Sequence, residues 1–242
     1  MKLIKLDAID STNEFLKGLS NKHEVENYTV VTAETQSKGK GQMGSKWNSE
    51  PGKNLIMSVL IKDFLFDYEA VFNLNVVVSL AVIRSLKKYD IPELSIKWPN
   101  DIMSANKKIG GILIENSIKG DGTITSIVGL GLNVNQTKFQ NLPRASSLAL
   151  VSNTTFDKEK ILISIVSKIK KIIADYAVKA PSLWEEYSNE LFKIGTPTAF
   201  ADENEINFMG IIKGVSAMGK LQIQLEDDSI CEYSLKEVQM LY

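Results

Sequence analysis

The chain has 242 residues, with 28 Lys and Arg against 29 Asp and Glu, a net charge of −1 and 44% hydrophobic residues. This composition predicts a soluble globular protein with one substantial core, and it gives no electrostatic reason to expect a nucleic-acid partner. No apolar run is long enough to span a bilayer and no signal-peptide pattern opens the chain, so we expect no membrane partner and a cytoplasmic location. The single cysteine, Cys231, and the single histidine, His23, exclude an internal disulfide and a Cys/His zinc cluster.

The first part of the chain predicts a helix, two strands and a second helix. Ser11 and Glu14 have capping-box spacing, which predicts a short helix that begins there. Apolar, β-branched runs predict strands over residues 28–34 and 55–61. Apolar residues at helical spacing then predict a largely buried helix from about Tyr68 to Tyr89.

The middle of the chain predicts more strands and then two helices. The expected strands cover residues 94–98, 109–118 and 123–135, the last two joined by a turn at residues 119–122. A long helix is predicted from Asp157 to about Tyr176. A separate helix is predicted to open at Pro181, because proline suits a first helical turn.

After Gly195 the helical period disappears. Leu221, Ile223 and Leu225 alternate with polar residues, which predicts a small all-β barrel or sandwich. We therefore predict an α+β protein. Residues 1–193 would form a mixed sheet with packed helices, and residues 194–242 would form a small β unit.

Residues 39–44 read GKGQMG and match the G-x-G-x-x-G fingerprint of dinucleotide-binding folds. That fingerprint requires a helix that opens on its last glycine, because the helix N-terminus binds the pyrophosphate. Here Gly44 is followed by a polar stretch and then by Pro51 and Gly52, which do not start a long helix. The sequence predicts a strand, a long loop and a second strand, so the dinucleotide-binding interpretation fails.

Three further segments combine polar residues with glycines or a turn: KWPNDI at 97–102, KKIGGILIE at 107–115 and GLGLNVN at 129–135. Glycine inside a strand often marks the close approach of a ligand or of another backbone. Taken singly, each segment is also explained by turn chemistry, a bulge or tight sheet packing. Together they predict one site on the sheet where backbone, amide and ammonium groups converge on an anionic ligand.

Five motifs in this order, followed by a small β domain, resemble the biotin protein ligases of the biotin–acetyl-CoA-carboxylase ligase type. The resemblance covers nearly the whole chain, and five motifs in register make it specific. It implies the class II synthetase-like catalytic fold of biotin and lipoate ligases, followed by an SH3-like β-barrel. The motifs are STN at 11–13, AETQSKGKGQMGSKW at 33–47, KWPNDI, KKIGGILIE and GLGLNVN.

The resemblance implies a two-step reaction with biotin and ATP as substrates and Mg²⁺ on the phosphates. Biotin's carboxylate is first joined to the α-phosphate of ATP, which releases pyrophosphate and gives biotinyl-5'-AMP. Biotin then passes to one lysine of a biotin carboxyl carrier protein. Family members that also act as repressors carry an N-terminal DNA-binding domain, whereas the STN motif begins here at Ser11, so the catalytic-only class is expected. A homodimer is compatible with the resemblance.

The motif match also implies roles for individual residues. Lys108 and Lys40, with the backbone of the glycine loop, would face the carboxylate and the α-phosphate, where anionic charge builds up. The biotin-binding residues implied are Ser11, Thr12, Asn13, Gln36, Lys40, Gly41, Gln42, Lys108 and Gly111. The ATP-binding residues implied are Gly39, Lys40, Gln42, Trp47, Asn100 and Asn133. No protein side chain is implied as a metal ligand.

Two roles leave an alternative open. Trp47 would stack on the adenine, whose edge Asn133 would read; a buried core tryptophan is the alternative. Asp101 would orient the incoming lysine, with proton loss largely to water. A carboxylate with a pKa of about 3.9 is a poor base for an ammonium of about 10.4. A pKa raised by burial would make Asp101 a better base.

The loop departs from the family's usual G-R-G-R-x-G, because Lys40 and Gln42 replace the arginines. Arginine offers a rigid fork matched to phosphate, whereas lysine is a mobile point charge and glutamine is uncharged. The loop is therefore expected to bind anions, while its retention of the adenylate is open to question. We also expect it to be mobile when empty and ordered over the ligand.

Two rival functions stay open. Lipoate ligases and octanoyltransferases share the catalytic fold, but the predicted catalytic part offers no nucleophilic cysteine, since Cys231 lies in the β unit. A non-catalytic adenylate-binding or regulatory module would bind nucleotide without turnover.

Overall fold

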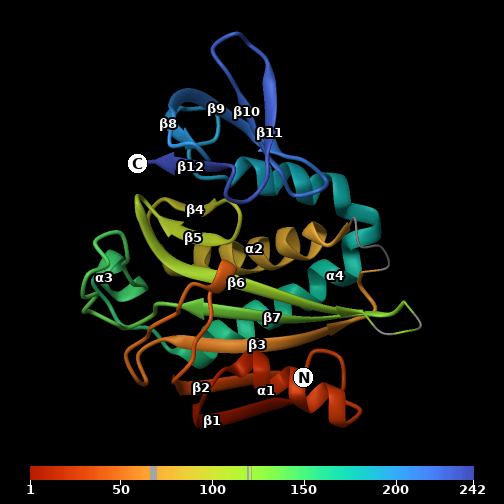
Figure 1. Cartoon of the computed structure of the whole chain (residues 1–242). Coiled ribbons are helices and arrows are strands. Elements are labelled where there is room, and N and C mark those ends of the chain that lie inside the picture. The colour runs from red at the N-terminus through yellow and green to blue at the C-terminus, as the bar shows by residue number, and fades with distance from the viewer. Residues whose placement is uncertain (66–69, 119, 121) are drawn as a thin grey trace.

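Figure 1 shows the computed structural model, which describes residues 1–65, 70–118, 120 and 122–242. A seven-stranded sheet crosses the molecule, and two long helices pack on one of its faces. A second, five-stranded sheet stands next to the β4–β5 end of the first.

The larger sheet has the strand order β1-β2-β3-β7-β6-β5-β4. β1 and β2 run parallel and all other neighbours run antiparallel, which confirms the predicted mixed sheet. β3 and β7 lie at the centre and are buried on both faces, which explains their nearly continuous apolar sequences. The strands are β1 (Leu3–Ile9), β2 (Val30–Gln36), β3 (Leu55–Lys62), β4 (Leu94–Lys97), β5 (Asp101–Ser104), β6 (Lys107–Ile118) and β7 (Ile124–Leu132).

Helices cover both faces of this sheet. α2 (Phe72–Leu86) and α4 (Lys158–Asn189) pack together and form the main core with one face. α1 (Thr12–Lys22) packs on the other face, where the Ser11 hydroxyl accepts a hydrogen bond from the Glu14 amide, as the capping-box spacing predicts. The smaller core beneath α1 consists of Leu16, Val25, Val31, Leu60 and Ile127. No helix among the described residues is both long and apolar enough to cross a membrane.

α4 corrects the prediction of two separate helices. It runs without a break through Pro181, which is exposed. Ile172, Leu183 and Tyr187 are all buried, so one apolar stripe continues across the proline. Packing of this stripe compensates for the backbone hydrogen bond that proline cannot donate.

Three elements lie outside the predicted ones: β1, β5 and the short helix α3 (Leu148–Ser152). The predicted strands are otherwise confirmed to within a few residues at their ends. α2 ends at Leu86 and continues into one turn of 3₁₀-helix, η3 (Lys87–Tyr89). The predicted helix start at Tyr68, and Lys119 and Asp121 of the predicted turn, lie outside the described residues.

The end of the chain forms the second sheet, antiparallel and ordered β11-β10-β9-β8-β12. This confirms the predicted all-β unit and is consistent with a small SH3-like domain. No pairing joins β11 to β12 in the described part of the chain, so the structure shows an open sheet rather than a closed barrel. A domain boundary between residues 193 and 194 stays a prediction. The strands are β8 (Pro197–Asp202), β9 (Asn207–Val215), β10 (Leu221–Gln224), β11 (Ile230–Tyr233) and β12 (Val238–Leu241).

Tyr187 provides a test of core stability. Its side chain is fully buried against Phe72, and its hydroxyl has no hydrogen-bond partner among the described residues. An unpaired buried hydroxyl costs about 1–3 kcal/mol. Tyr187→Phe should therefore raise the free energy of unfolding by about 1 kcal/mol in urea denaturation.

The matched control is Tyr176→Phe, because the Tyr176 hydroxyl accepts a hydrogen bond from the Trp184 indole at 3.2 Å. This control should be neutral or destabilising. A destabilised Tyr187→Phe would contradict the assignment of an unpaired hydroxyl.

Candidate functional site

The register of the central strands brings glycines together on one face of the sheet, so that this part of the face carries almost no side chains; we call it the cleared face. Gly111 of β6 lies opposite Gly131 of β7, and the next pair on this face joins Leu113 to Gly129. Because side chains alternate along a strand, Gly129 and Gly131 share a face, as the sequence predicts. A pocket of about 270 Å³ lies there, between the start of α1, the β2–β3 loop and strands β6 and β7.

Two side chains use the room above these glycines. A Cβ at Gly131 would lie 2.4 Å from the Trp47 indole, and one at Gly129 would lie 2.5 Å from Asn13 Oδ1. The sequence predicts that a ligand or another backbone approaches these glycines. In the structure, the side chains of Trp47 and Asn13 occupy this space. Trp47 is only partly buried and lines the pocket, so it is not a core tryptophan.

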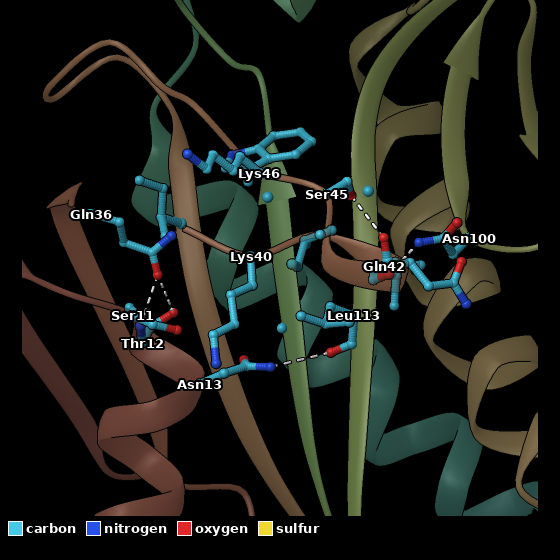
Figure 2. Close-up of a pocket in the computed structure, with 18 of the residues that line it drawn as sticks. Ser11, Thr12, Asn13, Gln36, Lys40, Gln42, Ser45, Lys46, Asn100 and Leu113 are labelled. Carbon is cyan, nitrogen blue, oxygen red and sulfur yellow. Dashed lines mark hydrogen bonds between the residues drawn. The ribbon is translucent and has the colours of Figure 1, made fainter. Parts of the chain in front are cut away.

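A hydrogen-bond network fixes the polar groups at the α1 end of the pocket (Figure 2). Gln36 Oε1 accepts from the backbone amide of Thr12 at 2.7 Å and from its hydroxyl at 3.0 Å. The Ser58 hydroxyl lies 2.8 Å from Thr12 Oγ1 and 2.6 Å from Asn13 Oδ1. Asn13 Nδ2 donates to Glu115 Oε2 at 2.6 Å. The Gln36 amide is therefore oriented with its oxygen on Thr12, which leaves Nε2 as the donor for the pocket.

Ser58 and Glu115 belong to the site although no sequence motif assigns either of them a role. Ser58 is the one polar residue in the apolar run of residues 55–61, and it is fully buried. A buried hydroxyl needs a hydrogen-bond partner, so a serine in the middle of an apolar strand indicates a polar contact at that position.

Lys108 reaches the pocket because β6 is irregular. The pairing of β5 with β6 shifts at Ile102 and Met103, which gives β6 an extra residue at Ile109. This bulge turns Lys108 to the side of Gly111, where the two lie close enough that a Cβ on the glycine would be 3.5 Å from Lys108 Nζ.

Lys108 and Asp101 form an ion pair in the pocket wall. Lys108 Nζ lies 2.6 Å from Asp101 Oδ1 and 5.8 Å from the centroid of the Trp47 ring. The carboxylate that the sequence assigns to the incoming lysine therefore already has a cationic partner.

Lys40, the other predicted cation, extends between Gln36 and Asn13 (Figure 2). It pairs with Glu14 at 2.5 Å. The hydrogen bond from Lys40 lowers the pKa of the Glu14 carboxyl, and the Glu14 carboxylate in turn raises the pKa of Lys40. Both groups therefore stay charged around neutral pH, although the pair is exposed.

A second cavity, of about 330 Å³, adjoins the pocket and shares Lys46, Trp47 and Lys108 with it. Asn133 lines this second cavity rather than the first, and its Nδ2 donates to the Ser146 carbonyl at 2.9 Å. Lys108 thus stands at the junction of two cavities.

The structure brings most of the predicted site residues together. Gly39 lies outside the lining of both cavities and supports the loop instead, because its carbonyl accepts from the Trp47 amide at 3.0 Å. No group of three His, Cys, Asp or Glu suited to a metal occurs in the described ranges. The predicted residues that line the first pocket are Ser11, Thr12, Asn13, Gln36, Lys40, Gly41, Gln42, Trp47, Asn100, Asp101, Lys108 and Gly111.

The chain belongs to the biotin/lipoate A/B protein ligase family, whose model matches residues 6–133. This range contains α1, the β2–β3 loop with Lys40, and strand β6 with Lys108.

The chain is also similar to individual members of this family. The bifunctional ligase/repressor BirA of Bacillus spizizenii is 29% identical over 93% of this chain and 70% of its own length. The biotin–acetyl-CoA-carboxylase ligase of Mycobacterium tuberculosis is 26% identical over 79% of this chain and 71% of its own. The biotin protein ligase of Aquifex aeolicus, solved with biotin and ATP, has a TM-score of 0.80 and 28% identity over 99% of this chain and 98% of that chain.

Gly131→Ala tests whether Trp47 depends on the cleared face. The added methyl would lie 2.4 Å from the indole, so Trp47 must leave its position beside Lys108. Trypsin should then cut the loop at residues 37–54 faster than in the parent chain. Gly18→Ala is the control, because no atom lies within 4 Å of its Cβ. Equal cleavage of both variants would show that Trp47 does not depend on Gly131.

Proposed function

We propose that this chain is a biotin–protein ligase, which activates biotin with ATP and transfers it to a lysine of a biotin carboxyl carrier protein. The observation that carries the proposal is the position of Lys108 between two cavities. Joining a carboxylate to a phosphate brings two anions together, and an ammonium at their meeting point lowers that repulsion. The two relatives named as biotin ligases, from Mycobacterium tuberculosis and Aquifex aeolicus, support the same activity.

In this proposal the first pocket binds biotin. The ureido ring presents N–H donors and a carbonyl acceptor, so it needs both acceptors and donors from the protein. The network of Thr12, Asn13, Gln36 and Ser58 supplies both kinds of group at the α1 end of the pocket. The valeryl carboxylate would then point toward Lys108.

The second cavity would bind the nucleotide. Trp47 forms a flat apolar wall on which a purine can stack, and the buried Asn133 amide offers polar groups to its edge. Lys40 and the loop backbone would face the phosphates. The described residues offer no cluster of carboxylates for Mg²⁺, which would be held chiefly by the phosphates of ATP and by water.

In the transfer step Asp101 would orient the acceptor lysine. Asp101 Oδ1 lies 2.6 Å from Lys108 Nζ, so this carboxylate already binds one ammonium of the site. This supports positioning by Asp101, with the lysine proton lost to water. Because ATP is the co-substrate, we also propose that the protein acts in the cytoplasm; a homodimer stays a prediction for sedimentation analysis.

The main alternative is activation of lipoate or octanoate on the same fold. Cys231 of β11 lines neither cavity, so it does not supply a nucleophile there. Acid-dependent exchange of pyrophosphate into ATP decides between the substrates. We expect exchange with biotin and none with lipoate or octanoate. Exchange with lipoate or octanoate alone would assign the chain to that class, and no exchange with any acid would contradict the enzymatic proposal.

Lys108→Ala should reduce biotin-dependent exchange by roughly a hundredfold or more, because it removes the cation at the junction of the cavities. The matched control is Lys107→Ala, which removes the neighbouring exposed lysine that donates to the Pro143 carbonyl at 2.6 Å. The control should retain activity. Near-parent exchange in folded Lys108→Ala would remove this lysine from the reaction.

Gln42→Arg should slow the release of the adenylate without changing whether it is made. Gln42 lies in the short 3₁₀ turn η1 (Gln42–Gly44) on the pocket wall, where an arginine fork could reach phosphate oxygens. Biotin with ATP should also protect residues 37–53 from proteolysis, since an ordered loop would exclude water from the anhydride. Unchanged adenylate dissociation together with unchanged cleavage would mean that the loop is not a lid.

A further inference from the structure

The turn between β9 and β10 lies against the β4–β5 turn, which carries Asn100. The carbonyl of Gly219 in this β9–β10 turn accepts a hydrogen bond from the Trp98 indole N–H at 2.9 Å. Trp98 precedes Asn100 by two residues, and Asn100 lines the proposed biotin pocket. A backbone group of the second sheet thus contacts the segment that leads into the site.

The β9–β10 turn is built to hold this carbonyl in place. The Gly219 amide donates to the Ser216 carbonyl at 2.8 Å, and the Ser216 amide donates to the Lys220 carbonyl at 2.8 Å. Gly219 has a φ of +81°, in the left-handed region that favours glycine, and a Cβ there would lie 2.4 Å from the Phe72 ring.

Phe72 has little room to withdraw from the turn. Its ring packs against Trp184 and Tyr187 of α4, with centroids 5.9 Å away in both cases. The turn therefore rests on a fixed aromatic surface, and this surface sets the height of the Gly219 carbonyl above the β4–β5 turn.

The β4–β5 turn is also held by α2 and β6. Asn75 Nδ2 donates to the Pro99 carbonyl at 2.6 Å. The backbone carbonyl of Asn100 accepts a hydrogen bond from the Ile112 amide at 2.9 Å, and Asn100 Nδ2 donates one to the Ile112 carbonyl at 2.7 Å. The next residue, Asp101, is the ion-pair partner of Lys108. A shift of this turn would therefore move both Asn100 and Asp101 against the catalytic lysine.

We propose that the β9–β10 turn positions Asn100 and Asp101 for the reaction, and that Trp98 is a positioning residue acting through the Gly219 carbonyl. The inference rests on the proposed function and deepens it, because it gives the second sheet a defined part in building the site. Neither Trp98 nor Gly219 lines the biotin pocket, so their effect on the reaction is indirect.

Two variants break the contact in different ways. Trp98→Phe removes the indole N–H and keeps an aromatic ring. Gly219→Ala pushes the turn away from Phe72 and strains its backbone. Gly195→Ala is the matched control, since Gly195 also has a positive φ, +67°, but no atom lies within 4 Å of its Cβ. Thermal unfolding of each variant shows that it is folded.

In both variants we expect kcat of biotin-dependent pyrophosphate exchange to fall about tenfold, because small misplacement of reacting groups is costly. KM for biotin should stay within about twofold, since Thr12 and Gln36 are not touched. Amide hydrogen exchange over residues 100–104 should also become faster in both variants and stay unchanged in Gly195→Ala.

Trp98→Phe with parent kcat and parent hydrogen exchange would overturn the proposal, as would equal loss of kcat in Gly195→Ala and Gly219→Ala. The hydrogen-exchange measurement needs no substrate, so it separates the two hypotheses. A parent chain without pyrophosphate-exchange activity would contradict the proposed function. Hydrogen exchange alone would then test the link between the two turns.

Discussion

The cleared face of the sheet, formed by Gly111, Gly129 and Gly131, is the constraint on which the site depends. Strand register brings these glycines together, and their missing side chains let Asn13 and Trp47 lie directly on the sheet. From Asn13 the hydrogen-bond network extends to Ser58, Thr12 and Gln36, and Trp47 forms the wall between the two cavities. A single methyl at Gly129 or Gly131 would meet one of these side chains at 2.4–2.5 Å, so both cavities rely on the same backbone.

Electrostatics then decides what the cavities can do. Two unit charges 4 Å apart interact by about 4 kcal/mol at the effective dielectric of a protein surface. On the proposed function, one ammonium at the junction would therefore offset a large part of the repulsion between a carboxylate and a phosphate. The β-bulge at Ile109 turns Lys108 toward this junction, and Asp101 holds it there while no ligand competes for it. Lys40 has an analogous partner in Glu14, so Lys40 and Lys108 are each paired with a carboxylate of the protein.

Much of this arrangement is predictable from local sequence. Capping spacing located α1, apolar runs located β3 and β7, and the motif resemblance gathered residues that do share one pocket. Features set by tertiary packing were missed. The helix through Pro181 is continuous because its buried stripe outweighs one lost hydrogen bond. β5 is four residues long and was interpreted as part of a turn. The roles of Ser58 and Glu115 depend on residues more than forty positions away in the sequence, which no local pattern encodes.

On the proposed function, biotin and the nucleotide share one ammonium, that of Lys108, between neighbouring cavities. Calorimetric titration of the intact chain with biotin, in the presence of a saturating, non-hydrolysable ATP analogue, tests it most directly. The structure predicts that biotin binds the nucleotide-loaded chain at one molecule per chain, and that Lys108→Ala weakens binding of both ligands. Mutual exclusion of biotin and the nucleotide would contradict this, because two ligands that compete for one cavity cannot be bound together and react.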